Sequence, residues 1–369
     1  MAELWSSAKL RLAKYSRAYK QRLLESFSVL CEYLKPLRIS PSQLFSLSKS
    51  QTDAVLERFI DNLHSKRNKQ KGALSIGKHA VLFVQIVKPR LRFQLKAVWA
   101  SLKAWEEQEP SQLRAPIPLP VLLGVLCQAR MTTEMHDNPK ERVKLLRFSA
   151  LVSLGYFGLL RPGELLKLKK EDVDLPNQLT FGAPCVTVRI RKPKNYRQLG
   201  HSQFSVVRQC DTCNWISWLV FMTPNDQDLL WPHSQSEFRK MFKQQCSGVL
   251  GKHHPFTPAS LRAGGATYMF DMHADVNRLR LLGRWANVQS LEHYVQTAKS
   301  QQLTLRISEA GITKITTFLT TGHFLLQVPF KLSKTLPSHC LLPSFDWTNC
   351  DGSSLWSRCR RWGCFEKEV

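Results

Sequence analysis

Three segments in the second half of the chain carry residues suited to chemistry on a phosphate. The first, GLLRPGELLKLKKEDV, places Arg161 directly before Pro162, with Glu164 three positions later. Proline favours the first position of a helix, so we expect Arg161 at a helix entrance, where free backbone N–H groups attract anions. Its planar guanidinium could bind a phosphate while Glu164 holds it in place. A simple ion pair at the start of a helix would explain the same two residues.

The second segment, TPASLRAGGATYMF, contains Arg262 followed by Gly264 and Gly265. Small residues beside an arginine let another backbone approach closely, so this segment could form part of a tightly packed phosphate site. The alternative is a surface arginine beside a contact between two helices.

The third segment, LLGRWANVQSLEHYVQ, contains Trp285 and Tyr294. We expect Gly283 to end one helix and Asn287 to cap the next, which would place Tyr294 on a short helix. A tyrosine hydroxyl can act as a covalent nucleophile. The alternative is a buried tyrosine whose hydroxyl donates to a backbone carbonyl.

In this order, the three segments resemble the tyrosine recombinases, the family of the phage integrases and Cre. SLRAGGAT together with LGRW is especially similar to the recombinases of crypton and DIRS mobile elements. The resemblance covers about 115–300. It implies that Arg161 and Arg262 clamp one scissile phosphate of double-stranded DNA and that Trp285 occupies the family's His/Trp position. It also implies that Tyr294 attacks to form a 3′-phosphotyrosyl link, without metal or cofactor.

The resemblance assigns roles to further basic residues. The family protonates the leaving 5′-oxygen with a lysine on a β-hairpin, and Lys192, at the end of VTVRIRK, takes that position, with Lys194 as the alternate. A solvated lysine in a turn near DNA is the ordinary alternative. Arg284, beside Trp285, could add a contact to the phosphate.

One position departs from the family pattern. A histidine should stand three residues before Arg262, where this chain has Ala259. A methyl group can neither donate to a phosphate nor accept the tyrosine proton. His253 and especially His254 lie just upstream and could reach the site. Three alternatives stay open: a slow enzyme, an enzyme that uses another base, or an inactive remnant of a mobile element that binds DNA without cleaving it.

The elements that must position these residues are mostly helical. CVTVRIRK at 185–192 and QFSVV at 203–207 alternate like paired antiparallel strands. The sequence therefore predicts a mainly α fold with a small antiparallel β-sheet. The expected helical stretches are 10–24, 79–105, 118–129, 140–160, 212–222, 234–247, 261–272 and a last block at 276–299.

A proline-rich stretch, EEQEPSQLRAPIPLP, separates two basic blocks and is the expected linker. We expect a helical DNA-binding domain at 1–112, a catalytic domain at 113–302 and a separate tail at 303–369. The tail holds four of the ten cysteines and has no clear periodicity, which is typical of a lineage-specific extension or an error in the gene structure.

The charge indicates a polyanionic partner. The 369 residues carry a formal charge of +25. Residues 1–112 hold 20 basic and 9 acidic side chains, and residues 113–300 hold 25 and 14, so both blocks are expected to contact DNA. A basic run at 64–79 adds phosphate-contact candidates, although a solvated loop is the ordinary alternative: Lys66, Arg67, Lys69 and Lys71.

Other features of the sequence bear on membrane insertion, cellular compartment and metal binding. The longest apolar runs, such as WLVFM at 218–222, are far shorter than the ~20 residues of a membrane span, so no membrane partner is expected. The cysteines suit reduced thiols in an intracellular protein, nuclear or organellar. Cys210 and Cys213 have metal-ligand spacing without a second pair, which favours two helix-start thiols over a metal site.

The sequence thus predicts DNA strand cleavage and rejoining in site-specific recombination or integration, by a protein that self-associates on DNA. A DNA-binding remnant of such an enzyme is the first alternative. A helical RNA-binding protein, which the charge alone would permit, is the second.

Overall fold

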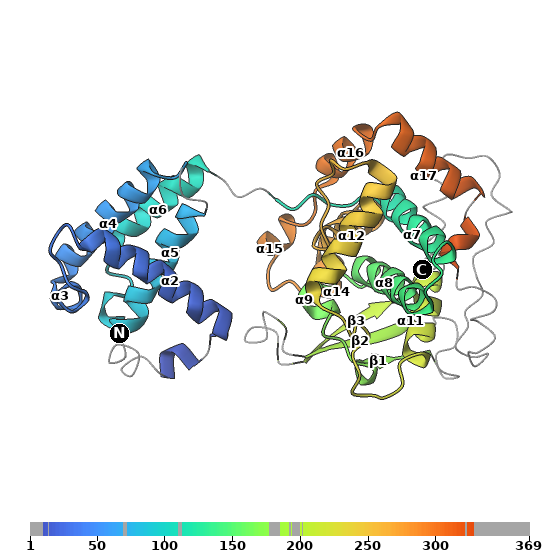
Figure 1. Cartoon of the computed structure of the whole chain (residues 1–369), viewed down its shortest axis with the longest axis horizontal. Coiled ribbons are helices and arrows are strands. Elements are labelled where there is room, and N and C mark those ends of the chain that lie inside the picture. Colours follow the sequence, from blue (N-terminus) through green and yellow to red (C-terminus); the bar gives the residue numbers. More distant parts are fainter. Residues whose placement is uncertain are drawn as a thin grey trace. The chain divides into compact units, whose positions relative to one another are not determined.

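The computed structural model describes residues 10–13, 15–68, 72–109, 113–176, 185–191, 193, 200, 202–321 and 323–327. They form two compact units, Met1–Gln112 (unit 1) and Leu113–Val369 (unit 2). The chain is mainly helical with one small antiparallel sheet, as predicted (Figure 1).

Unit 1 is a helical bundle around its own apolar core. Ser16, Ser40 and Ser48 cap three of its helices by accepting backbone N–H groups. Its elements are α2 (Arg17–Leu34), α3 (Pro41–Ser46), α4 (Lys49–Ser65), α5 (Ala73–Val87), the short 3₁₀ helix η1 (Pro89–Leu91) and α6 (Lys96–Gln108).

The single helical run expected at 79–105 is wrong. The structure has α5 up to Val87 and α6 from Lys96, separated by η1. Pro89 explains the break, because proline has no N–H to donate and restricts the residue before it.

Unit 2 is built around α8, whose last 13 residues include 12 buried ones, so that it is apolar nearly all round. The helices α7, α11 and α13 pack against it. The helices of this unit are α7 (Leu119–Glu134), α8 (Pro139–Phe157), α9 (Pro162–Leu165), α11 (Cys210–Phe221), α12 (Gln235–Leu250), α13 (Ser260–His273), α14 (Val276–Leu282), α15 (Val288–Glu292), α16 (Thr297–Leu305) and α17 (Glu309–Thr321), with the 3₁₀ turns η2 (Lys170–Asp172) and η3 (His323–Leu326).

The sheet of unit 2 has the order β1 (Val173–Asp174), β2 (Val186–Arg191), β3 (Ser202–Val207), with both pairs antiparallel. Val188 pairs with Ser205 in the longer ladder. Alternate residues of β2 are buried, which confirms the two expected strands.

The start of the expected tail belongs to the core of unit 2. The boundary expected at 302/303 falls inside α16, and α17 packs against α7. Ile315 and Phe318 are buried, and the indole of Trp215 donates to the Leu326 carbonyl at 2.7 Å. The buried residues of α17 follow a helical spacing that its many threonines obscure. The structure does not describe residues 328–369, where the tail's four cysteines lie.

The Gly264–Gly265 pair lets α13 lie directly against its neighbours. A Cβ at Gly265 would overlap the Tyr156 carbonyl of α8, and one at Gly264 would overlap the Ile117 carbonyl.

We therefore expect Gly265→Ala to lower the free energy of unfolding by about 1–3 kcal/mol or more, measured by urea denaturation. Gly163→Ala is the matched control, because nothing lies within 4 Å of the added methyl group. Equal stability of the two variants would contradict this packing.

Candidate active site

One carboxylate organises the first arginine segment. Glu164, in the four-residue helix α9, accepts from the side chain of Arg161 at 2.6 Å and from its backbone N–H at 3.0 Å. The helix begins at Pro162, as predicted, and Arg161 stands at its N-cap. The ion pair expected from the sequence is therefore present, and it holds a guanidinium that remains about a quarter exposed.

Arg262 lies in the interior, only 1% exposed. Its two terminal nitrogens donate to the carbonyls of Leu159 and Gly283, both at 2.5 Å. The guanidinium carbon lies 4.5 Å from the centre of the Trp285 ring and 5.3 Å from that of Tyr294. Arg262 is thus fixed on several sides before any ligand arrives, which excludes the alternative of a surface arginine.

Arg284 is also buried and turned inward. It donates to the Leu159 carbonyl at 2.9 Å and to the Leu282 carbonyl at 3.2 Å, and it lies 3.5 Å from Glu164 Oε2. The sequence favours a phosphate contact for Arg284, whereas the structure directs its guanidinium to backbone carbonyls.

Three guanidiniums therefore surround Glu164, since Arg262 also lies 3.8 Å from its Oε2. Burial by itself would raise the pKa of Glu164, but Arg161, Arg262 and Arg284 outweigh it and lower that pKa below its ordinary value of 4.5. Burial is the main cause that lowers the pKa of Arg262 and of Arg284; Arg161 adds to it for both, and Arg284 adds to it for Arg262.

Trp285 and Tyr294 are brought together by the break between α14 and α15. Gly283 follows the end of α14 and Asn287 caps α15, both as predicted. The helix ends at Glu292, so the expectation that Tyr294 lies on it is wrong; Tyr294 lies in the turn that follows. Its ring centre is 5.3 Å from that of Trp285.

An open cleft of about 850 Å³ brings the candidate residues to one surface of unit 2. Arg161, Arg262 and Tyr294, which lie far apart in the sequence, all line it. Ala259 and His254 line it as well, and the buried Trp285 contacts two of the lining residues, Arg262 and Tyr294. Of the residues that the structure describes, several arginines and no carboxylate line the cleft, so it favours an anionic group such as a phosphate.

His254 is the histidine nearest in sequence to Ala259. Its Nε2 lies 3.4 Å from both the Lys243 carbonyl and Ser247 Oγ. Burial lowers the pKa of His254 below 6.5, so the ring is mostly neutral at pH 7 and able to accept a proton. His253 is exposed and does not line the cleft.

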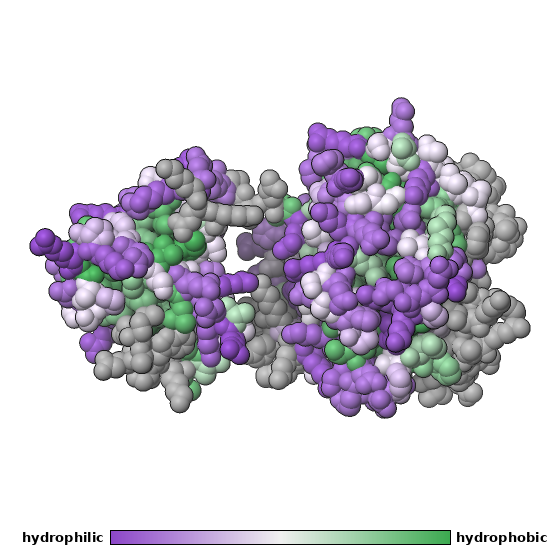
Figure 2. Space-filling model, in the orientation of Figure 1, coloured by the Kyte–Doolittle hydropathy of each residue, from purple (hydrophilic) through white to green (hydrophobic). Residues whose placement is uncertain are grey.

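Three further basic residues line the cleft and are not among the site residues expected from the sequence: Arg114, Arg239 and Lys243. Arg239 and Lys243 are exposed and one turn apart on α12, while Phe238 and Phe242 of the same helix are buried. No carboxylate pairs with Arg239 or Lys243 in the part of the chain that the structure describes. The spacing of two cations on an amphipathic helix is the signal that could have found them. Hydrophilic residues predominate on the face of unit 2 that Figure 2 shows.

Several expected DNA contacts lie outside the described residues, namely Lys69, Lys71, Lys192 and Lys194. Lys66 and Arg67 follow the end of α4 and are exposed. Arg67 lies 2.9 Å from Glu109 and donates to the His64 carbonyl, so part of its charge is already compensated.

The described ranges hold no group of three or more metal-ligating side chains that could bind an ion. Cys210 and Cys213 lie in the first turn of α11, and the buried Cys213 thiol donates to the Val207 carbonyl. Among the helices that the structure describes, none is long and apolar enough to cross a membrane.

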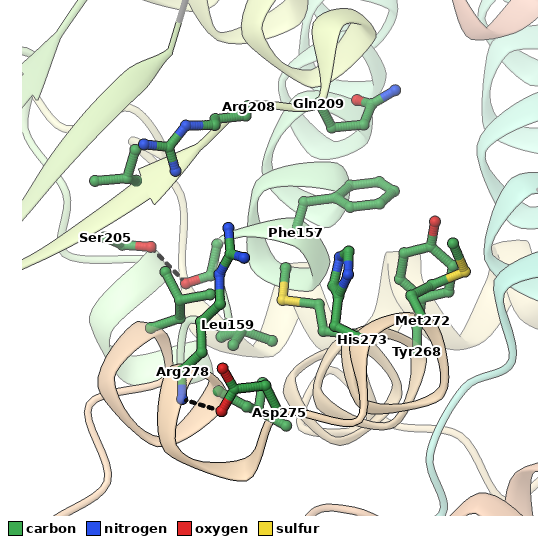
Figure 3. Close-up of a pocket in the computed structure, with 15 residues that line it drawn as sticks. Phe157, Leu159, Ser205, Arg208, Gln209, Tyr268, Met272, His273, Asp275 and Arg278 are labelled. Atoms are coloured by element: carbon green, nitrogen blue, oxygen red, sulfur yellow. Dashed lines mark hydrogen bonds between the residues drawn. The ribbon is translucent and has the colours of Figure 1, made fainter. Parts of the chain in front are cut away.

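A second, mostly apolar pocket has Gly158 and Leu159 in its wall (Figure 3). The Gly158 carbonyl accepts from Ser205 Oγ of β3 at 2.6 Å, which ties the turn after α8 to the sheet. Leu159 adopts a φ of 50°, in the left-handed region, and its carbonyl receives both buried arginines. The turn therefore separates this pocket from the arginine cluster and fixes the position of the cluster.

No family model matches the sequence, and no curated protein matches it. Among solved structures, the post-cleavage complex of the XerH site-specific recombinase with a palindromic difH substrate is 16% identical, with a TM-score of 0.47 and 72% of each chain covered. The pre-cleavage complex of XerH with difH substrate is 13% identical, with a TM-score of 0.42 and 81% of this chain and 93% of that chain covered. XerA recombinase is 17% identical, with a TM-score of 0.37 and coverage of 83% and 99%.

The shared carboxylate generates a stability prediction. Glu164→Gln leaves two buried guanidiniums without a counter-charge, so we expect the free energy of unfolding at pH 7 to fall by about 3–5 kcal/mol. The lowered pKa of Glu164 means that its contribution is fully present above pH 4.5 and is lost as the pH falls through the folded-state value. The difference between parent and variant should therefore shrink in acid, as measured by urea denaturation across pH.

Glu141→Gln is the control for that experiment. Glu141 is partly exposed and pairs with Lys144, which keeps Glu237 as a second partner, so its loss should cost no more than about 1 kcal/mol. A Glu164→Gln protein as stable as this control would show that Glu164 does not hold the cluster together.

Proposed function

We propose that the chain cleaves and rejoins double-stranded DNA as a tyrosine recombinase does, with Tyr294 as the nucleophile. The observation that carries the proposal is the single cleft lined by Arg161, Arg262 and Tyr294. The residues come from three separate segments, in the order and of the types that the family resemblance requires. Two guanidiniums and a phenol at one surface suit a phosphodiester better than any uncharged substrate.

The proposed step balances within DNA and protein. The Tyr294 hydroxyl oxygen attacks the phosphorus, its proton passes to a base, and the bond from phosphorus to the 5′-oxygen breaks. The leaving oxygen takes a proton, for which Lys192 is the candidate donor. Arg161 and Arg262 stabilise the charge on the non-bridging oxygens. Attack of a 5′-hydroxyl on the phosphotyrosine reverses the step and rejoins the strand, so the sequence of reactions uses neither metal nor cofactor.

The two arginines would play different parts. Arg262 is fixed by two carbonyls and two rings, so it is preorganised, whereas Arg161 is partly exposed and can turn toward the phosphate. Arg284 supports both indirectly, because it shares the Leu159 carbonyl with Arg262 and lies beside Glu164. We assign Arg284 and Glu164 to positioning and Trp285 to the wall of the site.

The remaining cations of the cleft would guide the duplex. Arg114, Arg239 and Lys243 are free to contact phosphates on either side of the scissile one, and the basic unit 1 adds further contacts. We further propose that the protein self-associates on DNA, that it acts on nuclear or organellar DNA, and that it descends from a crypton- or DIRS-type mobile element.

A DNA-binding protein without cleavage activity is the second candidate function. Ala259 favours it, because the methyl group lines the cleft where the family has a histidine. His254 lines the same cleft and is the replacement base if the chain is active.

Formation of a covalent adduct tests the proposal. A suicide DNA substrate, nicked beside the scissile phosphate, should give a protein–DNA adduct on a denaturing gel, and Tyr294→Phe should give none. Arg161→Ala should slow adduct formation by about 10²–10³-fold, as the loss of a transition-state donor does, while most DNA binding remains. Lys103→Ala, which removes an exposed cation of unit 1 that pairs with Glu107, is the control. Adduct from the Tyr294→Phe protein would remove Tyr294 as the nucleophile.

The missing histidine makes a gain of function possible. Ala259→His should raise the rate of adduct formation by up to about 10²–10⁴-fold, because it restores an acid–base group at the cleft. His254→Gln should lower the rate of the parent protein, and His253→Gln, at the exposed neighbour, should leave it unchanged. Tight DNA binding without adduct from either the parent or the Ala259→His protein would favour the second candidate function.

A further inference from the structure

Unit 1 presents one aromatic side chain to solvent in an unusual way. Phe93, in the turn between η1 and α6, is 78% exposed. Its φ is 65°, in the left-handed region that bulky residues rarely adopt. A backbone held in such a conformation costs free energy and persists only where the surroundings enforce it.

The turn is held firmly on both sides of Phe93. Leu91 and Leu95 are buried in the core of unit 1, at 0% and 1% exposure, so the chain enters the core, leaves it at Phe93 and enters it again. The N–H of Gln94 donates to the Leu91 carbonyl at 3.0 Å. Beyond the turn, the two carboxylate oxygens of Asp53 accept from the N–H groups of Ala97 and Val98 in the first turn of α6, at 3.0 and 3.1 Å. Phe93 is thus displayed by a rigid support.

The surroundings of Phe93 are cationic. Arg90, Arg92 and Lys96 are exposed, and none has an ion-pair partner in the described ranges. The guanidinium carbon of Arg92 lies 5.0 Å from the centre of the Phe93 ring. Three unpaired cations around one exposed ring favour a partner that is both polyanionic and able to stack.

We propose that Phe93 is a DNA wedge: its ring stacks on a base at a step that it opens, while Arg90, Arg92 and Lys96 bind the flanking phosphates. The proposal rests on the proposed function, because it takes double-stranded DNA as the partner. Apolar side chains inserted between base pairs unstack them and kink the duplex, and a rigidly displayed ring suits that task. A membrane surface is disfavoured, because the other exposed residues of the turn are polar or charged rather than part of an apolar patch.

The test compares two short DNA duplexes of the same sequence, one fully paired and one with a single unpaired 2-aminopurine. An unpaired base lowers the free-energy cost of opening the base step. The full-length protein should therefore bind the second duplex more tightly and change the 2-aminopurine fluorescence on binding. Phe93→Asn should remove that preference and weaken binding to this duplex by on the order of 5- to 100-fold, the loss expected for one base–aromatic stack. The slope of log affinity against log salt should stay the same, because no cation is lost.

A stability measurement and one further variant make the result specific. Asparagine tolerates the left-handed conformation, so Phe93→Asn should be at least as thermally stable as the parent while binding less well, a combination that a purely structural Phe93 would not give. Phe221→Ala, at an exposed phenylalanine at the end of α11, should leave the preference for the unpaired base intact.

Three outcomes would overturn the wedge. Salt-dependent DNA binding by the parent, with Phe93→Asn keeping the same preference and affinity, would refute the wedge and leave the proposed function standing. A Phe93-dependent preference found only with an RNA duplex would refute the DNA assignment. Absence of any DNA binding by the folded parent would instead refute the proposed function itself.

Discussion

The Glu164 carboxylate is the interaction on which the candidate site depends, because it allows three guanidiniums to occupy one small and largely dry volume. Two of those groups, Arg262 and Arg284, are almost fully buried, and burial of unpaired charge is strongly unfavourable. One carboxylate does not neutralise three cations. The excess positive charge beside the open cleft is therefore a built-in attraction for an anion, and a bound phosphate would complete the neutralisation.

Backbone carbonyls accept the other hydrogen bonds of the buried arginines. The turn after α8 presents the Leu159 carbonyl to both buried arginines, and this requires a left-handed conformation at a non-glycine residue. Ser205 of the sheet holds the adjacent Gly158 carbonyl. The small sheet and the buried helix α8 thus act on the site indirectly, by fixing the turn that fixes the arginines.

The sequence was most informative where a local rule decides the structure. Proline before Glu164 marks the start of α9, Asn287 marks a cap, and alternation marks β2. It was less informative where tertiary packing decides. The inward direction of Arg284 depends on a turn more than 100 residues away, and no local pattern contains that contact. The break at Pro89 follows a local rule, because proline has no N–H to donate, whereas the extension of the core through α17 depends on its packing against α7.

The burial of Arg262 has a consequence for how the site could lose activity during evolution. Arg262 supports the fold through the carbonyls of Leu159 and Gly283, so it would be retained even in a chain that no longer cleaves DNA. Ala259 and Tyr294 stabilise the fold less: Ala259 offers only a methyl group, and the partly buried Tyr294 contributes ring contacts with Trp285 and Arg262. A buried arginine in place is therefore weak evidence for catalysis, and a surface tyrosine in place is stronger evidence. Tyr294 at the cleft, next to the partly exposed Arg161, is therefore the part of the site that bears most directly on the proposed activity.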